Sequence, residues 1–407
     1  MRIAFLTPEY VSETAPDGGL ANYVRTTALG LLERGHKPTV IVASDRDRTW
    51  SDEGIEVCDV GTASTDWRLA KGVPLLARLH PLFRQYSACR RMARAFWRLH
   101  AERPFDIAQA SSFRAPGYYL LGNGRVPVVC RASSYTPLLR RAYGQRATLA
   151  DRLSDRLERR QVARADASFA PSRLIADVYA RLGTAAPRVM RSHVRLSVEG
   201  QDRSFFEKHR PVGRRYLLFF GTLSRIKGVD LIAEIIEPLL AAHADLGFVF
   251  IGRDDGLPDG RRCMDLVRSR APTTLSRIAY FPALPKPQLL PFVAGATAIV
   301  MPSRVDNYPN TCLEAQALGV PVVGTLDSSI DEMVEDGMTG FLATNSDSRS
   351  LRQSLERCLA MTQSEAVRMR DAVLAAAKRA QSEDRIGALI DFYEETRRAN
   401  ASRRRIG

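Results

Sequence analysis

Short apolar runs alternate with helical patterns along the whole chain. In the first half, apolar runs predict strands at Ile3–Thr7, Thr39–Ala43, Ile107–Ala110, Val126–Cys130 and Ala167–Ala170. Between the first two runs, apolar residues at helical spacing predict a helix over Leu20–Arg34 that ends at Gly35. The second half repeats the pattern, with predicted strands at Tyr216–Phe220, Phe248–Gly252, Ala279–Phe281, Ala298–Met301 and Val320–Val323. This alternation is typical of parallel α/β sheets, one in each half.

A polar stretch with a proline, Gln201–Arg215, separates the two halves and has the character of a linker. The 407 residues are enough for two hydrophobic cores. We expect an N-terminal domain at 1–205 and a C-terminal domain at 206–380. Residues 381–407 are expected to form a helix that packs back on the first domain and ends in a basic tail.

The composition excludes several classes of protein. The six cysteines contain no CxxC pair, which argues against a disulfide framework and against a zinc site. The apolar run near Met1 is too short for a secretory signal and is better explained as a first strand. No apolar run reaches the roughly 20 residues that a membrane-spanning helix needs. We therefore expect a cytoplasmic protein.

The net charge of +14 is concentrated in the first half, where residues 67–164 hold 20 basic and 5 acidic side chains. Arg84, Arg91 and Arg98 recur every seven residues and share a helix face with Arg94. The opposite face is apolar: Leu75, Leu79, Leu82, Tyr86, Ala93 and Phe96. This basic amphipathic helix is either a solvated surface or a contact for anionic lipid or a polyanionic acceptor. Nucleic acid is not expected, since the aromatic residues follow the apolar face.

Two carboxylates, Asp306 and Glu314, bracket a turn that leads into a predicted helix. In open α/β sheets ligands bind outside the carboxyl ends of the strands, and the backbone N–H groups of a helix N-terminus favour anions. The turn is therefore a candidate site for a sugar nucleotide. Glu314 has an alternative role, because Thr311 precedes it at the spacing of a capping box.

A second glycine-bearing loop, GTLSRIKGVDLI, follows the strand Tyr216–Phe220 and carries Arg225 and Lys227. These cations and a helix N-terminus can neutralise a diphosphate leaving group without a metal. A surface loop with a solvated lysine is the alternative. Near the start of the chain, the glycine pair in Asp17–Leu20 forms a similar turn, although the GxGxxG pattern is absent.

The segments DNYPNTCLEAQALGVPVV, GTLSRIKGVDLI, SSIDEMVEDGMTGFL, LERRQVARADASFAPS, DGGLANYV and ERGHKPTVIV together resemble the retaining glycosyltransferases of family 4. The resemblance implies the α/β fold called GT-B, with two facing Rossmann-like domains and a deep interdomain cleft. It also implies that the N-terminal domain, 1–205, binds the acceptor and that the C-terminal domain, 206–380, binds the nucleotide-sugar donor. It is weak between residues 45 and 125, so it does not identify the acceptor.

The resemblance also implies residue roles. Catalytic roles fall on Asp306 at the donor sugar, on Lys227 at the diphosphate, and on Arg225. The expected donor-binding residues are Gly18, Gly19, Thr222, Ala283, Leu284, Asn307, Tyr308, Pro309, Asn310, Thr311 and Glu314, of which Glu314 would bind the ribose. No metal and no cofactor are expected.

The sequence departs from the family pattern at three places. Asp306 stands where many members have glutamate, and Thr222 stands where an arginine is common, so Arg225 would supply that charge. A histidine common after the strand near Val128 is absent, and Arg131 or Ser133 would replace it. We therefore expect acceptor or membrane contacts from the following residues: Arg84, Arg91, Arg94, Arg98, Arg131 and Ser133.

The function expected is retaining transfer of a sugar from a nucleotide-sugar donor to a hydroxyl of a lipid-linked or cell-surface saccharide, as in polysaccharide or glycolipid biosynthesis. The enzyme would be cytoplasmic, and peripheral on the inner face of the plasma membrane if the basic helix binds lipid. Two alternatives remain: a sugar-nucleotide epimerase of the same fold, and a catalytically silent sugar-nucleotide-binding subunit.

Overall fold

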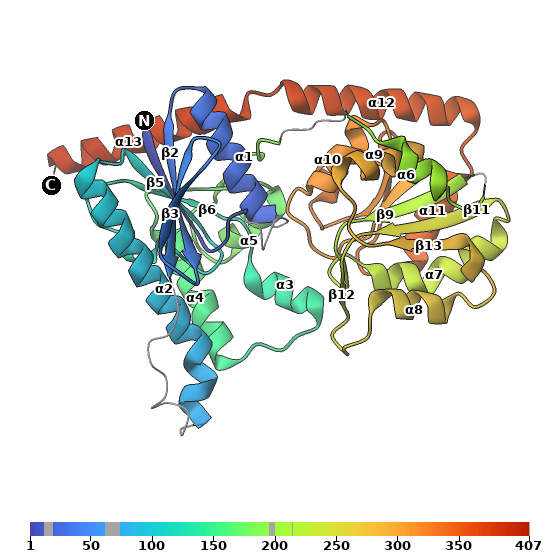
Figure 1. Cartoon of the computed structure of the whole chain (residues 1–407), viewed down its shortest axis with the longest axis horizontal. Coiled ribbons are helices and arrows are strands. Elements are labelled where there is room, and N and C mark those ends of the chain that lie inside the picture. Colours follow the sequence, from blue (N-terminus) through green and yellow to red (C-terminus); the bar gives the residue numbers. More distant parts are fainter. Residues whose placement is uncertain (12–18, 62–73, 195–199, 214, 407) are drawn as a thin grey trace. The chain divides into compact units, whose positions relative to one another are not determined.

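The computed structural model describes residues 1–11, 19–61, 74–194, 200–213 and 215–406 (Figure 1). The chain divides into two compact units, and each is described separately. The first consists of Met1–Pro137, Arg146–Arg195 and Asp384–Gly407, and the second of Leu138–Gln145 and Leu196–Glu383. Each unit contains a sheet of mostly or wholly parallel strands with helices on both faces, which confirms the expectation of two Rossmann-like domains.

The sheet of the first unit has eight strands in the order β3-β4-β2-β1-β5-β6-β7-β8. All neighbouring strands are parallel except β3 and β4. The strands are β1 (Arg2–Thr7), β2 (Lys37–Ser44), β3 (Arg48–Asp52), β4 (Ile55–Gly61), β5 (Ile107–Ser111), β6 (Val128–Arg131), β7 (Ala167–Ala170) and β8 (Arg188–Val189).

Helices cover both faces of this sheet. One face packs against α1 (Gly19–Glu33) and the C-terminal helix α13 (Arg385–Ile406), which buries Ile386 and Tyr393 in the core. The other packs against α2 (Pro74–Glu102), which contributes Met92 and Phe96. The first unit also contains α4 (Leu149–Arg164) and α5 (Arg173–Arg181), whereas most of α3 (Thr136–Tyr143) belongs to the second unit.

The sheet of the second unit has six parallel strands in the order β13-β11-β9-β14-β15-β16. The strands are β9 (Arg215–Phe220), β11 (Leu246–Ile251), β13 (Ile278–Phe281), β14 (Ala298–Met301), β15 (Val322–Thr325) and β16 (Gly340–Ala343), and β10 (Leu223–Ser224) pairs with β12 (Asp254–Gly256) outside this sheet. The chain adds strands to one side of β9 and then returns to add β14 on the other. The topological switch point therefore lies between β9 and β14, where α/β sheets bind ligands.

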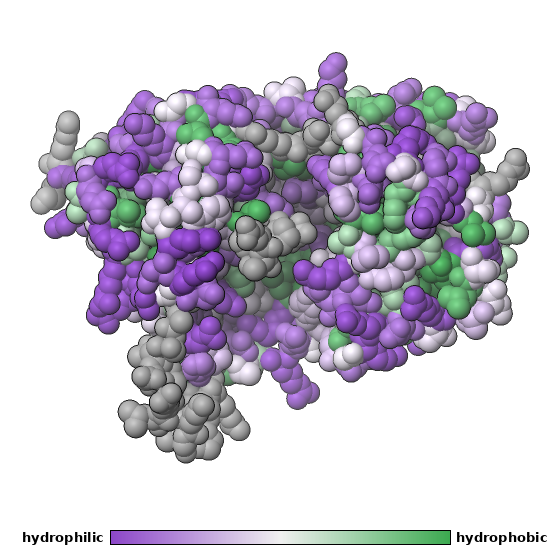
Figure 2. Space-filling model, in the orientation of Figure 1, coloured by the Kyte–Doolittle hydropathy of each residue, from purple (hydrophilic) through white to green (hydrophobic). Residues whose placement is uncertain are grey.

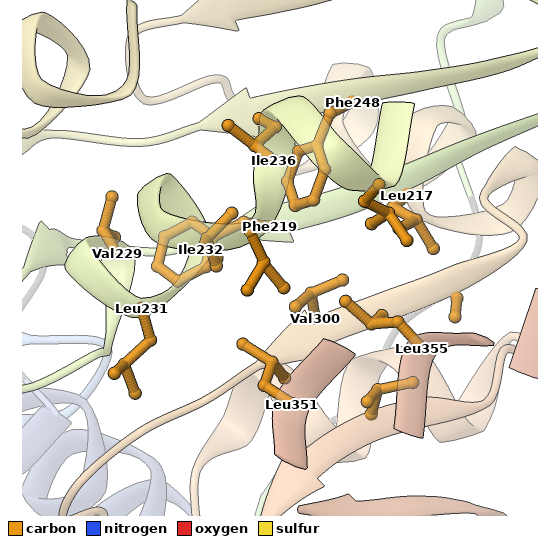
Figure 3. Close-up of a cluster of buried hydrophobic side chains, with 14 of the residues drawn as sticks. Leu217, Phe219, Val229, Leu231, Ile232, Ile236, Phe248, Val300, Leu351 and Leu355 are labelled. Carbon is orange, nitrogen blue, oxygen red and sulfur yellow. The ribbon is translucent and has the colours of Figure 1, made fainter. Parts of the chain in front are cut away.

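The core of the second unit explains why its strands are continuous apolar runs. Leu217 and Phe219 of β9 and Phe248 of β11 pack against Ile232 and Ile236 of α7 on one face (Figure 3). The side chains on the other face of these strands, such as Leu218 of β9 and Val249 of β11, belong to a second hydrophobic cluster. A strand covered on both faces needs apolar residues at consecutive positions. The helices are α6 (Arg203–Lys208), α7 (Val229–Ala242), α8 (Cys263–Arg270), α9 (Lys286–Gly295), α10 (Asn310–Ala317), α11 (Ser348–Leu359) and α12 (Gln363–Ser382).

The antiparallel pair β3–β4 was not predicted. Its residues fall in the stretch where the resemblance is weak, and β3, RTWSD, is a polar strand with mostly exposed or half-buried side chains. Glu53 and Gly54 make the turn with φ of 48° and 89°. An edge strand of this kind has no apolar period for sequence analysis to detect.

Candidate active site

Asp306 lies in the loop that joins β14 to α10. Its carboxylate accepts hydrogen bonds from Lys227 Nζ at 2.6 Å and Ser303 Oγ at 3.1 Å through Oδ2, and from the Asn307 N–H at 3.0 Å through Oδ1. The Asp306 N–H donates to Ser328 O at 2.9 Å. The Asp306 side chain is only 11% exposed. The carboxylate is thus held in one orientation at the carboxyl end of β14.

Lys227 comes from the other side of the switch point, in the loop between β10 and α7. The next residue, Gly228, has φ of 73°. It packs against Pro302, the residue after β14, so closely that a Cβ on Gly228 would lie 2.1 Å from Pro302 O. Only glycine fits there, and this close packing sets the two loops against each other. The structure therefore brings together two of the predicted catalytic residues as an ion pair across the switch point.

The loop that leads into α10 is strained. Tyr308 has φ of 59°, which is rare for a bulky side chain, and its N–H donates to Ser329 Oγ at 2.9 Å. Ser329 also has a left-handed backbone, with φ of 71°. Such strain costs about 1–3 kcal/mol per residue and is common at functional sites. The strained residue Tyr308 lies within the predicted donor-binding segment, Asn307 to Thr311, which leads into the first turn of α10.

Glu314 does not cap its own helix. The N-cap of α10 is Pro309 and makes no side-chain hydrogen bond, so Thr311 lies inside the helix and the capping-box alternative is wrong. The Glu314 carboxylate instead lies 3.2 Å from Lys286 Nζ. Lys286 is the first residue of α9 and was missed by the sequence analysis, because nothing in the local pattern pairs it with a residue 28 positions later.

The other donor-site predictions lie on the same edge of the second unit. Thr222 is half-buried in the loop after β9, and Ala283 and Leu284 lie between β13 and α9. In the first unit, Gly19 is the first residue of α1, while Gly18 lies outside the described residues.

Arg225 is turned toward other partners. Its Nη1 donates to Ala142 O at 2.6 Å, and its Nε lies 3.7 Å from Asp230 Oδ2. Asp230 itself forms a two-pronged ion pair with Arg304, at 2.7 and 2.9 Å. Sequence analysis missed this pair, which joins the β14 loop to the first turn of α7. In this arrangement Arg225 does not share the Lys227–Asp306 pair.

Arg131 contradicts the expectation of a membrane-surface role. It is 6% exposed, its guanidinium lies 3.7 Å from the centre of the Tyr23 ring, and its Nη2 donates to Ser192 Oγ at 3.1 Å. Burial lowers the pKa of this guanidinium. Since it ends β6 between packed elements, it cannot touch a lipid surface. Ser133 lies beside it, with its N–H donating to Ser112 Oγ at 3.0 Å.

The basic helix was correctly predicted as amphipathic. In α2, Arg84, Arg94 and Arg98 are exposed, whereas Leu82, Ala93 and Phe96 are buried. Arg91 is half-exposed and pairs with Asp47 at 3.3 Å. Leu75 is in the helix, but its side chain lies outside the described ones. Figure 2 shows a largely hydrophilic surface on the face along which the described part of α2 runs.

Within the described residues, no three His, Cys, Asp or Glu side chains gather as a metal site would require. No helix in the described part of the chain has the length and apolar character needed to cross a membrane.

Two family models match the chain. The model described as Glycosyltransferase Family 4 matches residues 17–192, and the model described as Glycosyl transferases group 1 matches residues 214–361. Among curated proteins, the D-inositol 3-phosphate glycosyltransferase 1 of Catenulispora acidiphila is 30% identical over 46% of this chain and 47% of its own length. That of Acidothermus cellulolyticus is 28% identical over 37% of this chain and 34% of its own length. The matches thus span less than half the length of these relatives.

Solved structures match along nearly the whole chain. Sucrose-phosphate synthase from Thermosynechococcus elongatus aligns with a TM-score of 0.75 at 15% identity, covering 98% of this chain and 99% of that one. Anabaena HepE in complex with UDP-glucose aligns with a TM-score of 0.65 at 17% identity, covering 97% and 99%. At these identities the likeness shows the fold alone, which is the GT-B fold.

Proposed function

Because the chain belongs to the group 1 glycosyltransferases of family 4, we propose that it transfers a sugar from a nucleoside diphosphate sugar to an acceptor hydroxyl with retention of the anomeric configuration. The observation that carries the proposal is the Lys227–Asp306 pair, which places a cation and a carboxylate 2.6 Å apart across the β9/β14 switch point. In the proposed reaction the cation would face the leaving diphosphate and the carboxylate would face the donor sugar.

The donor would bind along the carboxyl edge of the second unit's sheet. A nucleoside diphosphate carries about two negative charges, and Lys227 with the N-termini of α7 and α10, each worth roughly half a charge, can balance them. We propose that no metal is needed for this step. Glu314 would accept hydrogen bonds from the ribose, and the strained loop at Tyr308 would surround the sugar. HepE, a neighbour by fold, binds UDP and UDP-glucose, which supports a nucleotide-sugar donor.

Retention would follow from a front-side reaction. The bond between the anomeric carbon and the leaving phosphate oxygen breaks while the acceptor oxygen bonds to the same face, and the acceptor proton passes to that phosphate oxygen. No protein nucleophile is consumed. Lys227 stabilises the charge that develops on the diphosphate, and Asp306 orients the sugar.

We propose a lipid-linked or cell-surface saccharide as the acceptor and an anionic membrane as the place of reaction. The exposed arginines of α2 support this, at about 1 kcal/mol of attraction each near an anionic leaflet. The curated relatives are named for D-inositol 3-phosphate, a small anionic acceptor, so a phosphorylated polyol is the second candidate.

The test is a transfer assay with UDP-, GDP- and ADP-sugars, each with saccharide-lipid and polyol-phosphate acceptors, read by release of the nucleoside diphosphate and by NMR of the anomeric proton of the product. Release with a retained anomer is expected for one donor class. An epimerase would change the sugar without releasing the nucleotide, and a silent subunit would bind a donor and release nothing.

A further inference from the structure

Lys286 stands at an unusual place for a lysine. It is the first residue of α9, between Pro285 and Pro287, and the first turn of that helix contains no acidic residue and no capping side chain. A cation in the first turn opposes the helix dipole, so local helix stability does not explain the residue. Its side chain is 40% exposed and is turned toward Glu314.

The position of Lys286 relative to the switch point matches the span of a nucleotide. Strand β13, which leads to α9, is two strands away from β9 in the sheet. At the strand spacing of about 4.8 Å, its carboxyl end lies about 10 Å along the edge from the loop that carries Lys227. A diphosphate at Lys227 therefore places its nucleoside end near the loop that ends at Lys286.

Lys286 and Glu314 have opposite hydrogen-bonding character. A carboxylate only accepts, and a lysine ammonium only donates. Their atoms lie 3.2 Å apart, and the Glu314 side chain is 19% exposed. When the hydroxyls of a ribose donate to Glu314, the partly exposed Lys286 ammonium keeps N–H donors that a carbonyl oxygen of the attached base can accept.

We propose that Lys286 reads the base of the donor and selects bases that present a carbonyl oxygen over bases that present an amine. This inference rests on the proposed donor site. Uracil and guanine carry a carbonyl oxygen where cytosine and adenine carry an amino group. The amino group would place one hydrogen-bond donor against the ammonium donors of the lysine, which disfavours cytosine and adenine. The donor class is therefore a UDP- or GDP-sugar.

The test is calorimetric titration of the full chain with UDP, CDP, GDP and ADP. UDP and CDP have the same ribose, the same diphosphate and the same ring size. Any effect on ribose binding at Glu314 therefore cancels in the ratio of their dissociation constants, which reports the difference between the carbonyl and the amino group of the base. The wild type is expected to bind UDP about tenfold or more tightly than CDP, a difference typical of one well-placed hydrogen bond to a base. Lys286→Met is expected to reduce the ratio about tenfold, and Lys286→Gln is the second variant.

The matched control is Lys208→Met, at an exposed lysine at the end of α6, which should leave the ratio unchanged. Retained nucleotide binding with an unchanged UDP/CDP ratio in both Lys286 variants would overturn the role of Lys286 while leaving the donor site in place. Failure of the wild type to bind any of the four nucleotides would overturn the donor site itself, and this inference with it.

Discussion

Replacing Lys227 by alanine is the sharpest perturbation of the proposed mechanism. Its ammonium lies 2.6 Å from Asp306 Oδ2 and its side chain is 30% exposed, so a diphosphate could take over the same contact. Two unit charges 4 Å apart interact by about 4 kcal/mol at an effective dielectric constant of 20. Partial exposure reduces this to about 3 kcal/mol, the range measured when one transition-state donor is removed. At 1.36 kcal/mol per factor of ten, Lys227→Ala should lower kcat on the order of a hundredfold.

The assay is the initial rate of nucleoside diphosphate release at saturating donor, with the melting temperature measured in parallel. Asp306 keeps its hydrogen bonds from Ser303 and the Asn307 N–H, so the variant should remain folded. Lys378→Ala, at an exposed lysine of α12, is the control and should leave kcat unchanged. A folded Lys227→Ala protein with wild-type kcat would refute the assignment.

Four further outcomes are expected. Glu314→Gln should weaken nucleoside diphosphate binding, measured by calorimetry, by about 1.5–3 kcal/mol, the scale of a charged hydrogen bond. The same variant should leave the melting temperature nearly unchanged, because Glu314 caps no helix. Ser329→Ala removes the acceptor of the buried Tyr308 N–H and should cost about 1–3 kcal/mol of unfolding free energy in urea titrations, with weaker donor binding. Changing Arg84, Arg94 and Arg98 together to glutamate should abolish flotation of the protein with anionic vesicles at low salt. The same change at the exposed Arg262, Arg268 and Arg270 is the control and should leave flotation intact. Equal flotation of the two variants would contradict a specific lipid-binding surface on α2. Burial and, after it, the charges of Arg125 and Arg2 lower the pKa of His100, whose Nδ1 accepts the Phe105 N–H at 3.0 Å. Because the unfolded chain binds this proton more tightly than the folded chain, the free energy of unfolding should fall as the pH drops below about 6.5. His100→Gln should reduce that loss, which thermal melts at pH 8 and pH 5.5 would measure.

The sequence predicted the second unit well because its strands are buried on both faces. The run Ala298–Met301 is apolar at every position and is β14 in the structure. The family resemblance implied that Asp306 and Lys227 act on the same donor, and the structure brings their loops to one switch point of the sheet. No local pattern gave their distance.

The missed features are long-range or lack a sequence period. The Lys286–Glu314 and Arg304–Asp230 pairs join loops whose partners only the folded sheet brings together. In the first unit, Glu158 and Gln161 of α4 are buried and accept the N–H groups of Arg114 and Gly117, so polar residues occupy a core face that hydrophobic patterning assigns to solvent.

The membrane alternative for Arg131 is wrong for a related reason, whereas its expected contact with the acceptor stays a prediction. A charged side chain in an arginine-rich segment is expected to be exposed, yet this one stacks on Tyr23 and ends a central strand. Cation–π contact and one hydrogen bond to Ser192 hold it there. Its burial removes it from any membrane surface, whereas the arginines of α2 keep that prediction open.

The central claim is that the second unit binds a nucleoside diphosphate through Lys227, Asp306 and Glu314. Thermal melting of the full chain against UDP, GDP, ADP and their sugar conjugates tests it most directly, because a ligand at 100 times its dissociation constant stabilises the fold by about 2.7 kcal/mol. The account predicts a rise in melting temperature with one nucleotide family, strongly reduced in Lys227→Ala and Glu314→Gln. No rise with any nucleotide, or an equal rise in wild type and both variants, would contradict it.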